Sequence, residues 1–316
     1  AADLLDLCEV WKPDLVICDE IDFGAMVAAE RLGLPYATLL VIASGAFVRQ
    51  DIVADPLGEL RAAHGLPPDP GLAMLSRYLV LAPFPPSFRD PAYPLPAVAH
   101  SICPLPRREA PPDPLPTWLL GREETPTVYF TLGTIYNLES GDLFERVLAA
   151  VGELPVNVIA TVGRDLDAAL FDSHSPTVHI VSYIPQAEVL PHCAGVISHG
   201  GSGSVMGALA HGLPMLLLPM GADQPLNAAR GEALGVARAL DAVAATPTSI
   251  QDGLVAVLTE SSYRRQAERL RDEFLALPGP THALQLLELL AVEKRPLHEE
   301  KNIVKPHRQS DTRNPR

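Results

Sequence analysis

Short apolar runs alternate with segments of helical spacing along the first part of the chain. The β-branched run 14–18 is typical of a buried strand, and residues 22–32 have the apolar spacing of a helix. This helix is predicted to end at Gly33, because glycine readily adopts the left-handed conformation that closes a helix. Such alternation predicts a parallel sheet with helices on its faces. The other elements expected here are an amphipathic segment at 1–11, strands at 35–40 and 78–82, and one or two short helices within 55–77.

A second alternation of strands and helices begins near residue 127 and is long enough for a complete doubly wound domain. Strands are expected at 127–132, 156–162, 178–182, 195–198 and 214–218. Helices are expected at 141–153, 202–211, 224–234, 249–259, 262–276 and 281–293. The two halves share this pattern but no repeated sequence. The 316 residues therefore predict an α/β protein with two domains, 1–105 and 119–293.

Two segments break the alternation. Twelve prolines lie between residues 83 and 116, a density that disfavours regular helices and central strands. We interpret this segment as a semi-rigid connector, with the linker proper at 106–118. Residues 294–316 hold seven lysines and arginines, three acids and few apolar residues, so a disordered polar tail is predicted.

Composition excludes several classes of protein. The formal net charge of −14 repels nucleic acid backbones, so any anionic ligand must bind in a local pocket. No apolar stretch approaches the ~20 residues of a membrane span, and no signal peptide opens the sequence. The four cysteines have neither CxxC nor zinc-ligand spacing, which indicates reduced thiols. We predict a cytoplasmic protein with no nucleic acid partner, no transmembrane segment, no cofactor and no bound metal.

The densest chemical signal is the glycine-rich stretch 199–204, which joins an expected strand to an expected helix. Its glycines permit close approach of a ligand to the backbone, and a helix N-terminus offers unpaired N–H donors. Together these features predict a phosphate or diphosphate site. Ser202 and Ser204 are expected to cap the helix, to donate to a phosphate, or both. His199 is placed at the carboxyl edge of the sheet, where ligands of open α/β sheets bind.

The same stretch has two alternative interpretations. A plain tight turn with an ordinary cap does not need three glycines, two serines and a histidine together. The pattern Gly201-x-Gly203-x-x-x-Gly207 also resembles a dinucleotide fingerprint. Against this second interpretation, the next strand ends at 218–220 without an acidic residue, and the turn comes late in its domain.

Two flanking segments add polar groups near the same edge. Tyr183 follows a strand and is a candidate for holding a nucleobase, although a core tyrosine would have the same pattern. Asp223 and Gln224 also follow a strand. They are candidates either for capping the next helix or for binding vicinal hydroxyl groups.

Taken together, these residues resemble the family-one glycosyltransferases, which include plant secondary-product enzymes and bacterial enzymes that glycosylate antibiotics and macrolides. The resemblance spans 14–293 and is strongest at 183–227. It implies the GT-B fold, with two Rossmann-like doubly wound domains and the donor in the C-terminal one. It also implies inverting, metal-independent transfer of a hexose or deoxyhexose from a nucleoside diphosphate sugar to a hydroxyl of a small hydrophobic natural product. The matching positions are Tyr183-x-Pro185-Gln186-x-x-Val189-Leu190-x-His192, Ser198 to Ser204, Gly212-Leu213-Pro214, Pro219 and Asp223-Gln224.

The resemblance assigns roles to residues that match its motifs. The diphosphate would be bound by His199, Gly201, Ser202, Gly203 and Ser204, with Thr134 closing over it from the loop after the first strand of the domain. Tyr183, Ile184 and Gln186 would surround the nucleobase, and Asp223 and Gln224 would bind the sugar hydroxyls.

One departure bears on the nucleotide. Plant members carry a glutamate that binds the ribose hydroxyls, and here that position is Gly207. Losing a carboxylate that binds a diol should weaken the preference for ribose over deoxyribose. We therefore expect a thymidine diphosphate donor, with a uridine diphosphate donor as the alternative.

The catalytic base is the second departure. In this family a histidine near the start of the N-terminal domain deprotonates the acceptor, and an aspartate orients it. Asp19 matches the aspartate, or else it caps the following helix, and no histidine precedes it in the sequence. The N-terminal domain is therefore expected to be incomplete. A catalytically silent nucleotide-sugar-binding or helper protein remains the alternative function.

Overall fold

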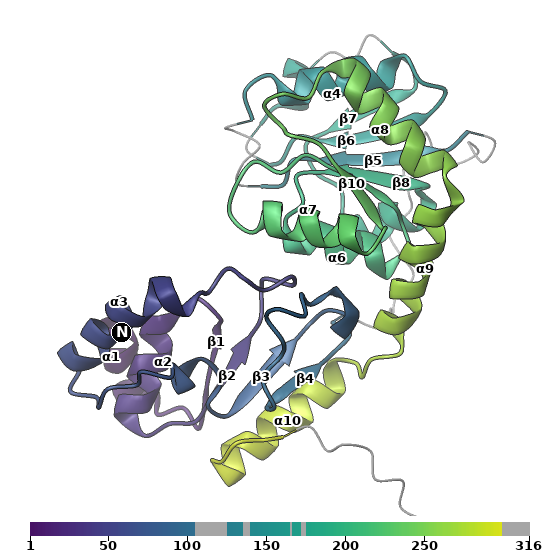
Figure 1. Ribbon diagram of the computed structural model, residues 1–316. Helices are drawn as coiled ribbons and strands as arrows, with labels where there is room; N and C mark the ends of the chain where they lie inside the picture. The colour runs from purple at the N-terminus through teal and green to yellow at the C-terminus, as the bar shows by residue number, and fades with distance from the viewer. Residues whose placement is uncertain (105–124, 135–139, 165, 172–174, 299–316) are drawn as a thin grey trace, which may run out of the picture.

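The computed structural model describes residues 1–104, 125–134, 140–164, 166–171 and 175–298. Two α/β domains lie one above the other, and each is built around a parallel sheet (Figure 1). The predicted linker at 106–118 lies outside the described residues.

The N-terminal domain holds a four-stranded parallel sheet in the order β1-β2-β3-β4. The predicted helix after the first strand is confirmed: the Asp22 carboxylate accepts the Ala25 N–H at its start, and Gly33 ends it with φ 66°. The elements are α1 (Ala2–Trp11), β1 (Val16–Asp19), α2 (Phe23–Leu32), β2 (Tyr36–Leu39), α3 (Gln50–Ala63), η1 (Ala73–Ser76), β3 (Leu79–Ala82), η2 (Pro86–Phe88) and β4 (Ala99–Ser101).

The proline-rich segment differs from the expected connector. Its first part folds onto the N-terminal domain, where Phe84 and Phe88 are fully buried. Strand β4 pairs with β3 at the edge of the sheet. An edge strand tolerates neighbouring prolines because one side of its backbone needs no partner, which is why proline density alone did not exclude it.

The C-terminal domain holds a six-stranded parallel sheet in the order β10-β9-β8-β5-β6-β7, the doubly wound order. All five predicted strands and six predicted helices are present. Of the described elements, four short ones, α5, β10 and the 3-10 helices η4 and η5, were not predicted, because each is too short for a periodic signal. The elements are β5 (Thr127–Thr131), α4 (Leu143–Gly152), β6 (Asn157–Thr161), η4 (Ala168–Leu170), β7 (Val178–Val181), α5 (Gln186–Val189), η5 (Leu190–His192), β8 (Gly195–Ser198), α6 (Ser202–Ala210), β9 (Met215–Leu217), α7 (Gln224–Ala233), β10 (Ala237–Ala239), α8 (Pro247–Thr259), α9 (Ser261–Leu275) and α10 (Pro280–Glu293).

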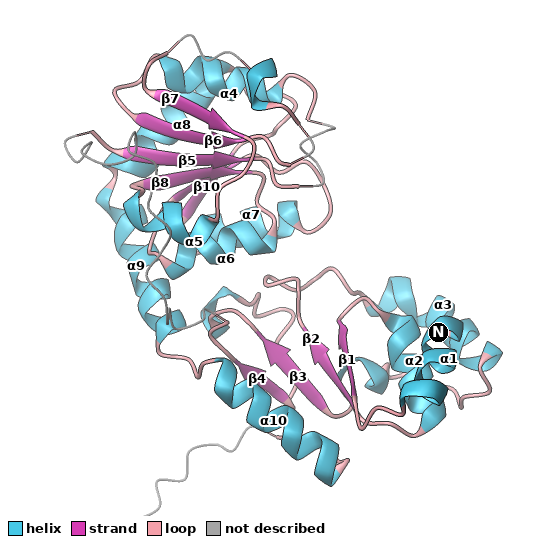
Figure 2. Cartoon of the chain, turned by 180° about the vertical axis from the view of Figure 1, so that it is seen from behind, coloured by secondary structure: helices cyan, strands magenta, loops and turns pink. Residues whose placement is uncertain are grey.

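Helices cover both faces of this second sheet (Figure 2). Apolar residues of α4 and α8 form one core with one face, and those of α6, α7 and α9 form another with the opposite face. The second of these cores continues into the N-terminal domain through residues such as Leu40, Ala43 and Phe88. The domains therefore share one apolar interface, which brings the loops of both sheets together.

Helix α10 belongs with the N-terminal sheet rather than with the donor domain to which the boundary at 293 assigned it. Leu286 and Leu290 pack against Leu79 and Leu81 of that sheet. The predicted tail also begins later than expected: Leu297 is 5 % exposed, and its N–H donates to the Tyr78 carbonyl at 2.8 Å. Leu297 is an apolar residue in an otherwise polar segment, and burying its side chain against the N-terminal sheet favours an ordered position for this part of the chain.

The helices of the described part of the chain are short compared with a membrane span. No single one is long and apolar enough to cross a bilayer, whereas α9 and α10 together meet the criterion only as a pair bent by 45°.

Candidate functional site

A cavity of about 480 Å³ opens at the carboxyl ends of β5, β6, β7 and β8. Strand order reverses between β5 and β8, and this is the position where open α/β sheets bind their ligands. The cavity gathers nine of the residues predicted for the donor from three separate segments. They are Thr134, Tyr183, Ile184, Gln186, His199, Gly201, Ser202, Gly203 and Ser204.

The glycine-rich stretch forms the turn from β8 into α6. Gly200 has φ 88°, and a Cβ there would lie 3.3 Å from the Gln224 carbonyl oxygen, so both conformation and space require glycine. Helix α6 begins at Ser202 after Gly201, which has no side chain to cap it, and the Ser202 N–H donates to the Asp223 carboxylate at 3.2 Å. The next two residues, Gly203 and Ser204, line the cavity, and their N–H groups lack intrahelical acceptors. This end of α6 is therefore built to receive an anion.

The His199 ring packs against two glycines from different strands. A Cβ on Gly133 would lie 2.7 Å from Nε2, and a Cβ on Gly201 would lie 2.5 Å from it. Nδ1 is buried and has no hydrogen-bond partner among the described residues. The pKa of His199 is lowered, because burial disfavours the charged ring. The nearby Asp223 charge and a hydrogen bond with the Thr131 backbone raise this pKa, but by less. The imidazole is therefore neutral at pH 7.

This lowered pKa predicts how stability depends on pH. The folded state takes up the His199 proton at lower pH than the unfolded state, whose pKa is about 6.5, so protons favour unfolding. We expect stability to fall as pH drops below about 6.5, and less steeply in His199→Gln. Melting temperatures of both proteins between pH 8 and pH 5 measure this, and parallel curves would contradict it.

Asp223 ties the start of α6 to α7. Its Oδ2 accepts the Ser202 hydroxyl at 2.7 Å, the Ser202 N–H at 3.2 Å and the Asn227 Nδ2–H at 2.7 Å. Although Asp223 occupies the N-cap position of α7, its side chain makes no capping bond there. Gln224 is 2 % exposed, and its Oε1 accepts the N–H groups of Met220 and Gly221. Both residues lie beside the loop, and neither lines the donor cavity.

Gln186 fills the space beside Gly207. A Cβ at Gly207 would lie 3.0 Å from Gln186 Oε1 and 3.3 Å from Leu190 Cδ1. Burial raises the pKa of the Tyr129 hydroxyl, and hydrogen bonds with Thr161, Thr131 and the Gln186 side chain partly oppose this. A longer side chain at position 207 would therefore displace Gln186.

Tyr183 stands at the rim of the cavity and is 53 % exposed, so it is not a core tyrosine. The Arg164 guanidinium lies 4.2 Å from the centre of its ring. One face of the ring is thus covered by a cation.

Asp19 is not brought into either described cavity. Its Oδ1 accepts the Ile21 N–H at 2.8 Å, and the helix cap proposed as its alternative role is made by Asp22 instead. The next residue, Glu20, lines a second cavity of about 280 Å³ in the N-terminal domain. Apolar side chains from both sides of this cavity include Leu40, Leu75 and Val80.

Known proteins with similar sequences are glycosyltransferases. The family model of the erythromycin biosynthesis protein CIII-like C-terminal domain matches residues 145–290. The 3-alpha-mycarosylerythronolide B desosaminyl transferase of Saccharopolyspora erythraea is 29 % identical, over 92 % of this chain and 72 % of that one. Aklavinone 7-beta-L-rhodosaminyltransferase of Streptomyces galilaeus is 30 % identical, over 93 % of this chain and 71 % of that one. The chain belongs to the antibiotic and macrolide glycosyltransferases.

Solved structures place this glycosyltransferase in the GT-B fold, as predicted. Spinosyn rhamnosyltransferase SpnG matches with a TM-score of 0.76 at 26 % identity, covering 91 % of this chain and 76 % of that one. Glycosyltransferase VinC in complex with dTDP matches with a TM-score of 0.71 at 28 % identity, covering 92 % and 75 %.

The glycosyltransferase cavity also contains hydroxyl groups that were not predicted. Tyr129, Thr131 and Thr161 lie at the carboxyl half of β5 and β6, and the Tyr129 hydroxyl lies 3.0 Å from Thr161 Oγ1. The signal for the two threonines was a hydroxyl residue one position before the end of two expected strands, 127–132 and 156–162, whereas Tyr129 lies within its strand. Among the described residues, no three His, Cys, Asp or Glu side chains gather as a metal site requires.

Proposed function

We propose that this glycosyltransferase moves a hexose or deoxyhexose, with inversion and without a metal, from a thymidine diphosphate sugar to a hydroxyl of a small hydrophobic natural product. The observation that carries the proposal is the cavity at the switch point, with the α6 N-terminus on one side and the half-exposed Tyr183 on the other. An anion site and an aromatic ring in one cavity suit the two ends of a nucleoside diphosphate.

The proposed diphosphate position is the start of α6. The free N–H groups at Gly203 and Ser204 would donate to the phosphate oxygens, and His199 and Thr134 would lie beside them. Charge leaving the anomeric centre in the transition state accumulates on the diphosphate, so these donors would stabilise the leaving group. The sugar-binding roles of Asp223 and Gln224 stay a prediction.

The proposed nucleobase position is the rim formed by Tyr183, Ile184 and Gln186. Gln186 occupies the space beside Gly207 where a ribose-binding carboxylate would have to lie. This supports a deoxyribose nucleotide, and VinC and SpnG have been solved with thymidine diphosphate.

The proposed acceptor position is the second cavity, whose lining combines apolar side chains such as Leu40 and Val80 with the charged Glu20 and Arg89. This cavity lies in the N-terminal domain. The shared apolar core joins that domain to the donor domain. Asp19 remains the proposed orienting partner of the general base.

Three nucleoside diphosphates distinguish the contribution of the base methyl group from that of the 2′-hydroxyl group. We expect the affinity order thymidine diphosphate, then 2′-deoxyuridine diphosphate, then uridine diphosphate. The first step measures the base methyl group and the second measures the 2′-hydroxyl. Isothermal titration calorimetry of the full chain gives all three dissociation constants. Tighter binding of uridine diphosphate than of its 2′-deoxy form would contradict the deoxyribose assignment, and absence of binding by all three would contradict the donor site.

A further inference from the structure

The loop 41–45 follows β2 and is held from one side by Glu20. Glu20 is 8 % exposed, and its Oε1 accepts the N–H groups of Val41 at 2.8 Å and Ile42 at 2.7 Å. A single carboxylate oxygen thus satisfies two consecutive backbone donors. Without Glu20 the N–H of Ile42, which is 5 % exposed, would be left unpaired at a buried position, and this is costly.

Arg89 holds the same loop from the other side. Its guanidinium donates to the Ile42 carbonyl at 3.1 Å and to the Tyr93 carbonyl at 2.7 Å. Gly45 has φ 83°, and a Cβ there would lie 2.7 Å from Arg89 Cζ, so the loop lies directly on the guanidinium. The N–H and C=O groups of Ile42 are therefore both fixed by buried or half-buried charged side chains.

The loop in turn reaches the donor domain. The Ala43 N–H donates to the Ser202 hydroxyl oxygen at 3.1 Å. The same oxygen accepts Asn227 Nδ2–H at 3.1 Å, and its own proton goes to Asp223 at 2.7 Å. Ser202 is the first residue of α6 and lines the donor cavity. Its hydroxyl is thus fully engaged, with one of its bonds coming from the other domain.

We propose that Glu20 is a positioning residue for the donor site: by holding the loop 41–45 it presents the Ala43 N–H to Ser202 and so fixes the first turn of α6 for the diphosphate. The inference rests on the proposed donor function of this cavity. Glu20 itself lies in the N-terminal domain and lines the other cavity. The path from it to the donor loop consists of two hydrogen-bonded steps, through the Val41–Ala43 backbone and then Ser202.

Variants at position 20 distinguish the effect of side-chain length from the effect of side-chain charge. Glu20→Gln keeps a carbonyl oxygen at the same distance and loses the charge, whereas Glu20→Asp keeps the charge and is one methylene too short for both N–H groups. We expect Gln to bind thymidine diphosphate within about twofold of wild type, and Asp and Ala to raise its Kd about tenfold, the equivalent of one lost hydrogen bond. Glu59→Ala, an exposed glutamate on α3, is the matched control and should match wild type.

A double-mutant cycle tests the path through Ser202. In the Ser202→Ala background, Glu20→Ala should raise the Kd for thymidine diphosphate no further, because the acceptor for Ala43 is already lost. Equal losses in both backgrounds would overturn the proposal, as would a Glu20→Gln variant that binds as poorly as Glu20→Ala.

Amide hydrogen exchange covers the case in which Glu20→Ala fails to fold. In the wild-type chain saturated with thymidine diphosphate, the Val41, Ile42 and Ala43 amides should exchange slowly. Fast exchange at Ala43 would overturn the positioning role even though the nucleotide binds. Failure of the nucleotide to bind wild type would instead count against the donor function, so the two failures are distinguishable.

Discussion

Gly201→Ala is expected to weaken thymidine diphosphate binding about tenfold to hundredfold while the protein stays folded. The backbone of Gly201, with φ −62°, accepts alanine, so the effect comes from the added methyl group alone. That group would lie 2.5 Å from His199 Nε2, and the same end of the ring already lies against Gly133. Forcing an extra carbon into such a contact costs about 1–3 kcal/mol, and the strain falls on the loop that receives the diphosphate.

Calorimetric titration of thymidine diphosphate into wild type and Gly201→Ala measures this effect. Gly58→Ala is the matched control, because a Cβ at Gly58 in α3 meets nothing within 4 Å. That control should bind normally and gain a little helix stability. An unchanged dissociation constant for Gly201→Ala would show that the His199 ring moves freely and takes no part in donor binding.

Glu30→Ala is expected to destabilise the N-terminal domain by about 3–5 kcal/mol, since it leaves a buried guanidinium without its partner. Glu30 Oε2 lies 3.0 Å from Arg61 Nη1, and the two side chains are 7 % and 3 % exposed. Glu30 Oε1 also accepts the Tyr36 hydroxyl at 3.2 Å and lies 3.3 Å from Arg77 Nη2. One carboxylate therefore joins α2, β2, α3 and the segment before β3.

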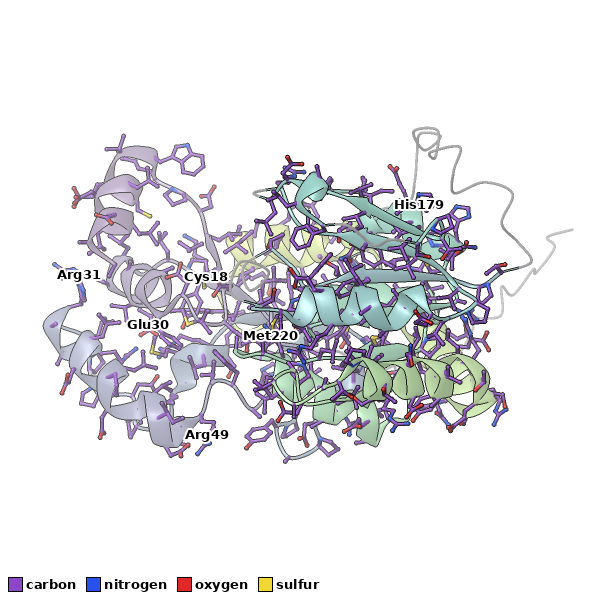
Figure 3. All side chains as sticks on the ribbon, turned by 90° about the horizontal axis from the view of Figure 1, so that it is seen from above. Cys18, Glu30, Arg31, Arg49, His179 and Met220 are labelled. Carbon is purple, nitrogen blue, oxygen red and sulfur yellow. The ribbon has the colours of Figure 1, made fainter. Side chains whose placement is uncertain are left out.

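The exposed ion pair of Arg49 and Asp51 is the natural control for that variant. Glu30 lies among the helices of the N-terminal domain, whereas Arg49 lies at its rim (Figure 3). Asp51→Ala should leave the urea midpoint unchanged, because an exposed pair contributes little. Urea unfolding followed by circular dichroism measures both variants, and similar midpoints for the two would contradict the importance of the Glu30 network.

The donor domain could be predicted closely from the sequence because its signals are local. Each strand is a short apolar run, and the glycine-rich stretch with His199 marks one junction of strand and helix. In a parallel sheet the carboxyl ends of all strands meet at one edge. Residues 134, 183–186 and 199–204 therefore had to come together once the strands were recognised, and they do line one cavity.

Other features depended on contacts between segments far apart in the chain. Nothing in the local pattern of α10 shows that it returns to the first sheet, because its apolar stripe suits either sheet. The composition around Asp223 and Gln224 slightly favoured a helix cap over ligands. In the structure the Asp223 side chain binds Ser202, and the Gln224 side chain binds the backbone of residues 220–221.

Asp19 and Glu20 show most clearly the difference between what local sequence patterns predict and what contacts between distant segments decide. From the sequence alone, the end of β1 was recognised as a functional position, and the carboxylate chosen there was Asp19. In the structure Asp19 accepts a neighbouring backbone N–H, while Glu20 lines a cavity and holds the loop that reaches Ser202. Successive side chains of an extended chain point to opposite sides, so a difference of one residue reverses what each can touch. The sequence by itself determined the α/β class of both domains, the residues that line the donor cavity and the glycine loop, since strands, helices and their junctions follow from local patterns. Only the tertiary structure decided which of two adjacent carboxylates faces the interface, because that depends on where a loop from another strand comes to lie.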